Sequence, residues 1–279
     1  MGSWIRASAT SHPTVVVGAA LLGLLAAAAV FAPWLGTVDP SAVSVVTRLR
    51  PPGEEFWFGT DTLGRDLYSR VLYGARVSLF VGFSVALLAT AAGLALGLVA
   101  GFWRRADAVL MRFMDGMMAI QPVLLAIALM ALTRASLQNV VLAITIAEVP
   151  RVVRLVRSLV LQLREQPFVE AATAAGTGVA RTLVRHILPN TMAPLLVQGT
   201  YIFASAMITE AILSFIGAGM PLNIPSWGNI MAEARSLFQL KPGLILIPGA
   251  FLSLTVLAVN LLGDGLRDLL DPKLVVRLE

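Results

Sequence analysis

The chain has 279 residues, of which 57% are hydrophobic and only 13% charged, and its mean hydropathy is +0.82. Soluble domains carry about 25% charged residues, so this composition excludes an ordinary soluble domain and indicates a protein of the lipid bilayer. The chain has no cysteine, which excludes disulfides and thiolate metal sites, and its net charge of +5 comes without a basic run interleaved with aromatic residues, which argues against nucleic-acid binding.

Runs of residues that are apolar and long enough to cross a bilayer, about 20 residues each, recur along the chain. The sequence predicts an all-α integral membrane protein with six transmembrane helices, near residues 14–36, 77–103, 113–133, 137–157, 190–217 and 243–263. The start of the chain could pass for a secretory signal, but the uncharged run from Pro13 to Val38 is longer than a typical signal, so we interpret it as a retained first span. We divide the chain into an N-terminal segment with the first span and an outer loop (1–76), a core of five spans (77–272) and a short tail (273–279).

The first outer loop, residues 37–76, is too long for a simple turn and is predicted to hold structure of its own. Gly59 and Gly64 bracket a turn that Asp61 can cap. Five arginines in this loop are offset by five acidic residues, although Arg70 and Arg76 lie unusually close to the second span.

Arginine placement predicts the orientation of the spans. Basic residues cluster between spans two and three, between spans four and five, and after span six, which puts these regions and both chain termini in the cytoplasm. We therefore expect a multi-pass protein of the cytoplasmic (inner) membrane.

Two patterns inside the spans predict packing. Gly93, Gly97 and Gly101, spaced by four residues, give the second span a bare face on which another helix can pack closely, and lining a path through the membrane is the alternative. The third span is rich in methionine, and we interpret Met111, Met114, Met117 and Met118 as core filling, with adaptation to varied substrates as the alternative.

Three acidic residues lie at membrane depth, where ionisable groups are costly and face protein or water. We expect Asp115 to pair with Arg112, and Glu148 to pair with Arg151, each three residues away. Glu210 has no charged neighbour in the sequence, which leaves two alternatives: it lines a wet translocation path, or it makes an interhelical hydrogen bond.

A polar stretch, residues 164–190, interrupts the apolar sequence between spans four and five. Pro167 suits the first turn of a helix, and Glu170 places a negative charge in that turn, where it complements the helix dipole. Alanines follow, Gly176 is typical of the residue that ends a helix, and Pro189 is expected to keep the next helical run from joining smoothly to this one. The stretch predicts a short helix with a nearly bare alanine face, which is a docking surface for another protein.

These residues carry a family resemblance. The sequence Glu170-Ala171-Ala172, then Gly176, then Ile187-Leu188-Pro189 resembles the EAA loop of permease subunits of ABC importers, in their oligopeptide, dipeptide and nickel branch. The resemblance implies that this loop forms the cytoplasmic coupling helix, which docks on an ATP-hydrolysing subunit. It assigns the coupling role to the following residues: Glu170, Ala171, Ala172, Gly176, Ile187, Leu188 and Pro189.

Three further motifs, in the expected order, extend the resemblance over about residues 57–272. The run 58–66 (FGTDTLGRD) in the first outer loop, the Pro225-Ser226-Trp227-Gly228 run in the second and the ending from Asn260 to Pro272 are all similar to the same branch. From the residues themselves, Ser226 is a plausible N-cap and Trp227 suits the membrane interface.

The resemblance implies a heterodimer with a homologous permease chain, two ATP-binding subunits inside and a substrate-binding protein outside. ATP and Mg²⁺ would be bound by those ATPase subunits, so this chain would need no cofactor and no metal of its own. It has no G-x-x-x-x-G-K-[ST] phosphate loop and no pattern typical of an active site, so we expect a transport subunit and not an enzyme.

Several alternatives stay open at this stage. An ion-coupled secondary transporter is one, although the chain has no evident internal repeat. A membrane-anchored scaffold or receptor is another. Within the favoured class, di- or oligopeptides are the expected cargo, with nickel chelates, glutathione, opines or sugars as alternatives.

Overall fold

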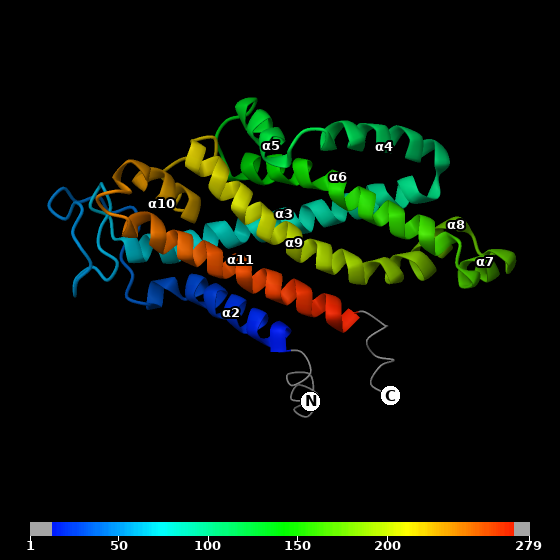
Figure 1. The fold of residues 1–279 in the computed structure, drawn as a ribbon, viewed down its shortest axis with the longest axis horizontal. Coiled ribbons are helices and arrows are strands. Elements are labelled where there is room, and N and C mark those ends of the chain that lie inside the picture. Colours follow the sequence, from blue (N-terminus) through cyan, green and yellow to red (C-terminus); the bar gives the residue numbers. More distant parts are fainter. Residues whose placement is uncertain (1–12, 271–279) are drawn as a thin grey trace.

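The computed structural model describes residues 13–270, and within them the chain is almost entirely helical (Figure 1). Long helices run roughly side by side: α2 (Pro13–Val30), α3 (Leu67–Phe102), α6 (Leu137–Arg164), α9 (Leu188–Ile216) and α11 (Gly243–Leu270). The shorter elements connect them: η1 (Ala32–Trp34), α4 (Arg104–Met118), α5 (Pro122–Ala131), α7 (Pro167–Ala174), α8 (Val179–Thr182), η2 (Leu183–Ile187), α10 (Trp227–Ala234) and η3 (Arg235–Leu237). The outer loops with α10 lie at one end of the molecule, and α7 and α8 lie at the opposite end.

The helical spans follow the predicted runs with one clear exception. By length and composition, four helical stretches of the described chain can cross a membrane, namely 13–30, 67–102, 179–216 and 243–270. The predicted third span, 113–133, is not one helix, because α4 and α5 meet at an angle of 89°. The fourth predicted span lies in α6, which is long enough but carries charges along its second half, so these criteria leave the count of six unconfirmed.

The bend between α4 and α5 has a local cause. Pro122 cannot continue a helix from the residues before it, and Gln121 adopts an extended conformation at the break. Because apolar residues lie on both sides of Pro122, the sequence predicted one span across the bend. The predicted pairing of Asp115 with Arg112 is also wrong, since Asp115 lies 2.6 Å from Arg154 of α6, so α4 lies against α6 through an ion pair.

The packing of α3 on α6 forms the centre of the molecule and confirms the packing interpretation of the glycine face. A β-carbon at Gly93 would lie 2.4 Å from Val152, and one at Gly97 would lie 2.6 Å from Val156. Gly101 faces Val160 in the same way. The valine side chains therefore occupy the space that side chains on α3 would need, and the two backbones approach closely.

Helix α3 begins at Leu67, earlier than the predicted 77, and the division at residue 76 falls inside it. Its start is set by Asp66, whose carboxylate accepts a hydrogen bond from the Ser69 N–H at 2.9 Å. The turn before it was predicted correctly: Gly59 and Gly64 have positive φ, and Asp61 accepts from the N–H groups of Leu63 and Arg65. The first outer loop is thus an ordered structure, as expected from its length.

Candidate functional site

The predicted coupling helix is present as α7, within the loop that joins α6 to α9. Pro167 occupies its first turn, and Glu170 lies in that turn as predicted. At the other end Gly176 has φ +82°, a left-handed conformation, and the backbone closes on it with two hydrogen bonds: Gly176 N–H to Thr173 C=O at 2.9 Å, and Thr177 N–H to Ala172 C=O at 3.0 Å. This is a Schellman cap, so the glycine fixes the end of α7.

The outward face of α7 is small and apolar. Residues at helical spacing i, i+3, i+4 and i+7 share one face, and here they are Phe168, Ala171, Ala172 and Ala175. The Phe168 side chain is 43% exposed, Ala171 and Ala175 are exposed, and Ala172 is half-buried. Helix α7 lies at the far end of the molecule, with no other element of the chain beyond it (Figure 1). A partner can therefore approach this face closely.

The opposite face of α7 holds the helix on the body of the protein. Val169 is buried, and Arg164, at the end of α6, donates to the carbonyls of Gly101 and Phe102 at 3.1 and 3.4 Å, so it caps the end of α3. A cavity of about 470 Å³ lies beside this face and is lined by residues of α7, of α8 and of the ends of α3 and α6, Glu170 among them. The loop thus rests on the ends of α3 and α6, and its outward face stays uncovered.

The remainder of the motif joins the loop to α9. The helical run that contains Pro189 does not join α7 smoothly, as predicted: α7 ends before Gly176, and a π-turn at Leu183–Ile187 lies just before the proline, which occupies the first turn of α9. From Val179 to Ile216 the chain is one helical stretch. A π-turn accommodates a proline ring that would otherwise clash with the carbonyl four residues earlier. Ile187 is fully buried in the central core, Leu188 is half-buried and Pro189 is exposed. Ile187 therefore anchors the loop and is not a docking residue.

Glu210 lies deep in the protein, at the junction of α9 and α10. It is 1% exposed, and its Oε1 accepts hydrogen bonds from Ser226 Oγ at 2.8 Å and Ser214 Oγ at 2.9 Å. Gly228 packs directly against it, since a β-carbon there would lie 3.2 Å from Oε1. Of the two alternatives from the sequence, this geometry favours the interhelical hydrogen bond.

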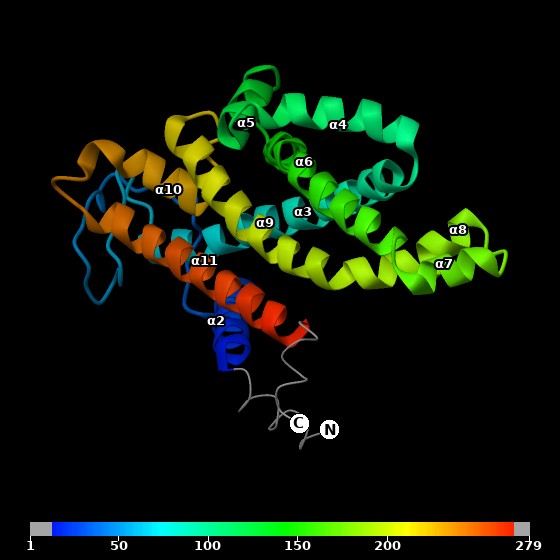
Figure 2. The ribbon, with the colours of Figure 1, turned by 45° about the vertical axis from the view of Figure 1, so that its right-hand side comes forward.

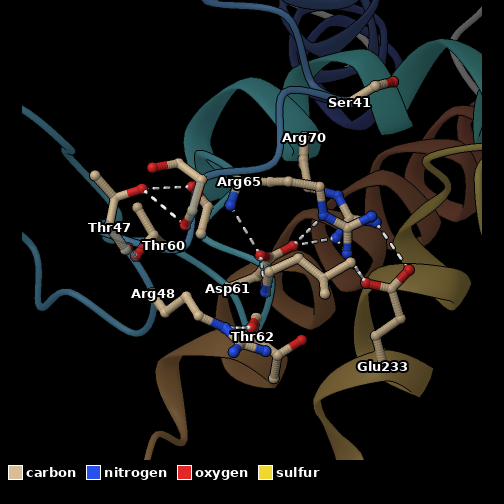
Figure 3. A network of polar contacts seen from close by, with 12 residues as sticks. Ser41, Thr47, Arg48, Thr60, Asp61, Thr62, Arg65, Arg70 and Glu233 are labelled. Carbon is tan, nitrogen blue, oxygen red and sulfur yellow. Dashed lines mark hydrogen bonds and ion pairs between the residues drawn. The ribbon is translucent and has the colours of Figure 1, made fainter.

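The second buried polar group was not predicted as a unit. Arg65 in the first outer loop and Arg70 at the start of α3 contact Asp61 and also Glu233 of α10, which is distant in the sequence (Figure 3). Arg70 Nη1 lies 2.7 Å from Glu233, and Arg65 Nε lies 2.6 Å from Asp61. The two positive charges meet two negative charges, so this ion cluster is neutral.

Partners within the chain explain how Arg70 and Arg76 can lie close to the second predicted span. Arg70 is neutralised within the ion cluster, and Arg76 donates to the carbonyl oxygens of Ala29 and Val30 at the end of α2. Burial raises the pKa of Asp61, but the Arg65 N–H and the charges of Arg70 and Arg65 outweigh it and hold the pKa below its ordinary value.

Other predicted polar residues are placed as follows. Glu148 pairs with Arg151 at 3.2 Å, as predicted. Ser226 caps α10, as predicted, by accepting from the Asn229 N–H. Trp227 does not lie at a membrane interface: it is fully buried, and its indole N–H donates to the Val71 carbonyl at 2.9 Å. Within residues 13–270, no group of three His, Asp or Glu side chains is placed to hold a metal ion.

Comparisons with known proteins agree with this architecture. Residues 93–276 match the family model described as "binding-protein-dependent transport system inner membrane component". The chain is 50% identical to a probable peptide ABC transporter permease protein of Sinorhizobium fredii, over 95% of this chain and 91% of that protein. It is 47% identical to a putative peptide transport system permease protein of Brucella abortus (94% and 89%), and 37% identical to the oligopeptide transport system permease protein of Bacillus subtilis (95% and 87%).

Among solved structures, an inward-facing structure of the MetNI methionine ABC transporter is similar in fold. The TM-score is 0.56 at 18% identity, with 70% of this chain and 93% of that chain covered. At this identity the similarity concerns the fold alone.

Proposed function

The chain belongs to the family of inner membrane components of binding-protein-dependent transport systems and is a permease subunit of an ABC transporter, and from this premise we propose that it carries di- or oligopeptides into the cell. The cargo is inferred from the relatives, whose names describe peptide, dipeptide and oligopeptide transport. The chain is not an enzyme, and ATP hydrolysis belongs to partner subunits.

The observation that carries the coupling mechanism is the outward face of α7. Phe168, Ala171 and Ala172 form a small apolar surface that the chain itself leaves uncovered, on a helix that the Schellman cap at Gly176 keeps short. We infer that this face docks on an ATPase subunit, with the alanines allowing close approach. Glu170 lies on the opposite face of α7, where it lines the cavity beside α8, and we assign it the polar anchoring of the coupling helix in the loop. Movement of the ATPase pair is then transmitted through Ile187 to α9, which is continuous with the loop.

The proposed assembly has a second, homologous permease chain, two ATP-binding subunits on the α7 side and a substrate-binding protein at the outer loops. ATP and Mg²⁺ are bound by the ATPase subunits. Both chain termini lie in the cytoplasm in this arrangement, which the arginine distribution supports.

The test uses the complete importer, reconstituted in proteoliposomes with its binding protein. Replacing Ala171 by Trp places a large ring on the docking face, whereas Ala171→Ser keeps the residue small. We expect Ala171→Trp to lower ATP-dependent peptide uptake by about tenfold or more, equivalent to about 1.4 kcal/mol of lost coupling, and Ala171→Ser to retain it. Wild-type uptake by the Trp variant would exclude α7 as the coupling helix.

The cargo is tested separately in the wild-type importer. Uptake of labelled dipeptides and tetrapeptides is compared with uptake of a nickel chelate and of glutathione. Uptake of one of these other solutes without peptide uptake would make the cargo assignment wrong and leave the coupling assignment intact.

A further inference from the structure

A charged pair lies midway along α6, on the face toward α9. Glu148 is 2% exposed and accepts hydrogen bonds from Arg151 Nη1 at 3.2 Å and from Ser205 Oγ of α9 at 2.9 Å. The Arg151 guanidinium also lies over the Tyr201 ring, 5.0 Å from its centre. These contacts from two helices fix the arginine in place.

The depth of this pair follows from the packing of α6 on α3. Val152, the neighbour of Arg151, lies against Gly93, which is about 13 Å along α3 from Phe102 at 1.5 Å per residue. Phe102 is the end of α3 nearest the coupling loop. Placing this end at the edge of a hydrocarbon core about 30 Å thick puts Arg151 near the middle of the core. A charged group at this depth faces protein or water and not lipid.

Most N–H groups of the Arg151 guanidinium have no hydrogen-bond partner within the described residues. Its side chain is 35% exposed, and within residues 13–270 Glu148 is its one hydrogen-bond partner, although a guanidinium has five N–H groups. It lines a cavity of about 210 Å³ together with Ala147 and with residues at the α4–α5 bend, namely Met117, Met118, Ile120 and Pro122. Figure 2 shows this bend beside α6.

We propose that Arg151 is a subsite of the translocation path that binds the C-terminal carboxylate of a passing peptide. The proposal rests on the proposed peptide transport function. A guanidinium pairs with a carboxylate through two parallel N–H···O bonds, and the flexible thioethers of Met117 and Met118 adapt to varied side chains. Between passages Glu148 neutralises the arginine, and the competition between the two carboxylates keeps peptide binding weak enough for release.

The experiment compares a labelled dipeptide with the same dipeptide carrying a C-terminal amide, in the reconstituted importer. The binding protein has its own preference between the two, so the measured quantity is the ratio of free-acid to amide uptake, and the variant's ratio is divided by that of the wild type. Since the binding protein is unchanged, its preference cancels. Arg151→Gln is expected to lower this ratio by about tenfold, the usual effect of losing a hydrogen bond to a charged group.

Two further variants separate this role from a structural one. The double variant Glu148→Gln/Arg151→Gln removes both charges together, so no unpaired charge remains buried, and it should show the same drop in the ratio. Arg154→Gln on the same helix, whose partner Asp115 is exposed, should leave the ratio at its wild-type value. An unchanged ratio in both Arg151 variants, or an equal loss of free-acid and amide uptake, would overturn the subsite. Absence of any peptide uptake by the wild-type importer would instead overturn the proposed cargo, and the subsite with it.

Discussion

The outer end of the molecule and the coupling loop differ in the burial and ion pairing of their charged residues. At the outer end Arg65 and Arg70 are 7% and 1% exposed, and each contacts two carboxylates. In the coupling loop Glu170, Arg181 and Arg185 are exposed, and none of the three forms an ion pair within the described residues. The two regions lie at opposite ends of the molecule.

This difference indicates which parts of the subunit depend on partners. The charged residues of the outer end are paired within the chain, because its loop, the start of α3 and α10 are held together by the ion cluster and by the hydrogen bonds of Glu210. Apolar side chains of the same loop, Val45, Val46 and Trp57, are exposed and available to the proposed binding protein. The coupling loop is incomplete, because Phe168 and the alanines beside it remain uncovered. Variants at the outer end should therefore change folding and assembly, and variants in the coupling loop should change transport more than stability.

The largest effect is expected at Glu210. Glu210→Lys places an unpaired positive charge in a site that is 1% exposed, at a cost of about 5 kcal/mol or more, so the subunit should fail to assemble. Glu210→Gln keeps an oxygen that accepts from Ser226 and Ser214 and should assemble normally. Co-purification with the partner permease measures both. An assembled Glu210→Lys complex that no longer transports would favour the path-lining alternative.

A somewhat smaller effect is expected at the ion cluster. Arg70→Met leaves Asp61 and Glu233 with too few positive partners in a buried site, which should destabilise the protein by about 3–5 kcal/mol. Thermal unfolding of the detergent-purified subunit measures this loss. Arg48→Met is the matched control, since Arg48 is exposed and bonds only to the Thr62 carbonyl, and its change should stay within about 0.5 kcal/mol. Equal changes in the two variants would show that the cluster adds nothing specific.

How much of this could be predicted from the sequence depends on distance along the chain. The cap at Gly176, the turn capped by Asp61 and the N-cap Ser226 depend on residues a few positions apart, and local pattern predicted them. Contacts between distant residues were missed. The partner of Arg70 is Glu233, and the partner of Asp115 is on α6, and no local pattern encodes either.

The predicted functional site followed the same division. Helix α7 could be predicted from the sequence, because the proline in its first turn, its alanine face and the glycine that ends it follow one another along the chain. The burial of Ile187 and of Trp227 could not be predicted, because it is set by helices from other parts of the chain. The bend at Pro122 has a local signal in the proline itself, but this proline lies inside an apolar run, residues 113–133, that is long enough to predict a single span.

A smaller effect on stability, with a larger one on transport, is expected at Gly176. Valine at φ +82° is strained by about 1–2 kcal/mol, and nothing lies within 4 Å of the added β-carbon, so the strain is confined to the end of α7. We expect Gly176→Val to lose ATP-dependent uptake while the subunit still assembles. The single variant Gly176→Asn should retain uptake, because asparagine tolerates this conformation. Gly178→Ala is the matched control: its φ of −67° suits any residue, and it should transport as wild type.

The smallest expected effect is a change with pH in the melting temperature, and it distinguishes the contribution of the Asp61 charge from that of the Asp61 hydrogen bonds. Because the folded-state pKa of Asp61 is depressed, its charge stabilises the protein fully above the ordinary unfolded value of about 3.9, and this contribution is lost as the pH falls below that value. The gap in melting temperature between wild type and Asp61→Asn should thus be constant from pH 7 to pH 5 and narrow below pH 4. Asp39→Asn, at an exposed carboxylate that forms no ion pair within residues 13–270, should show no such narrowing. A gap that stays constant down to pH 3 would mean that the geometry of the turn, and not the charges of Arg65 and Arg70, gives the outer end its stability.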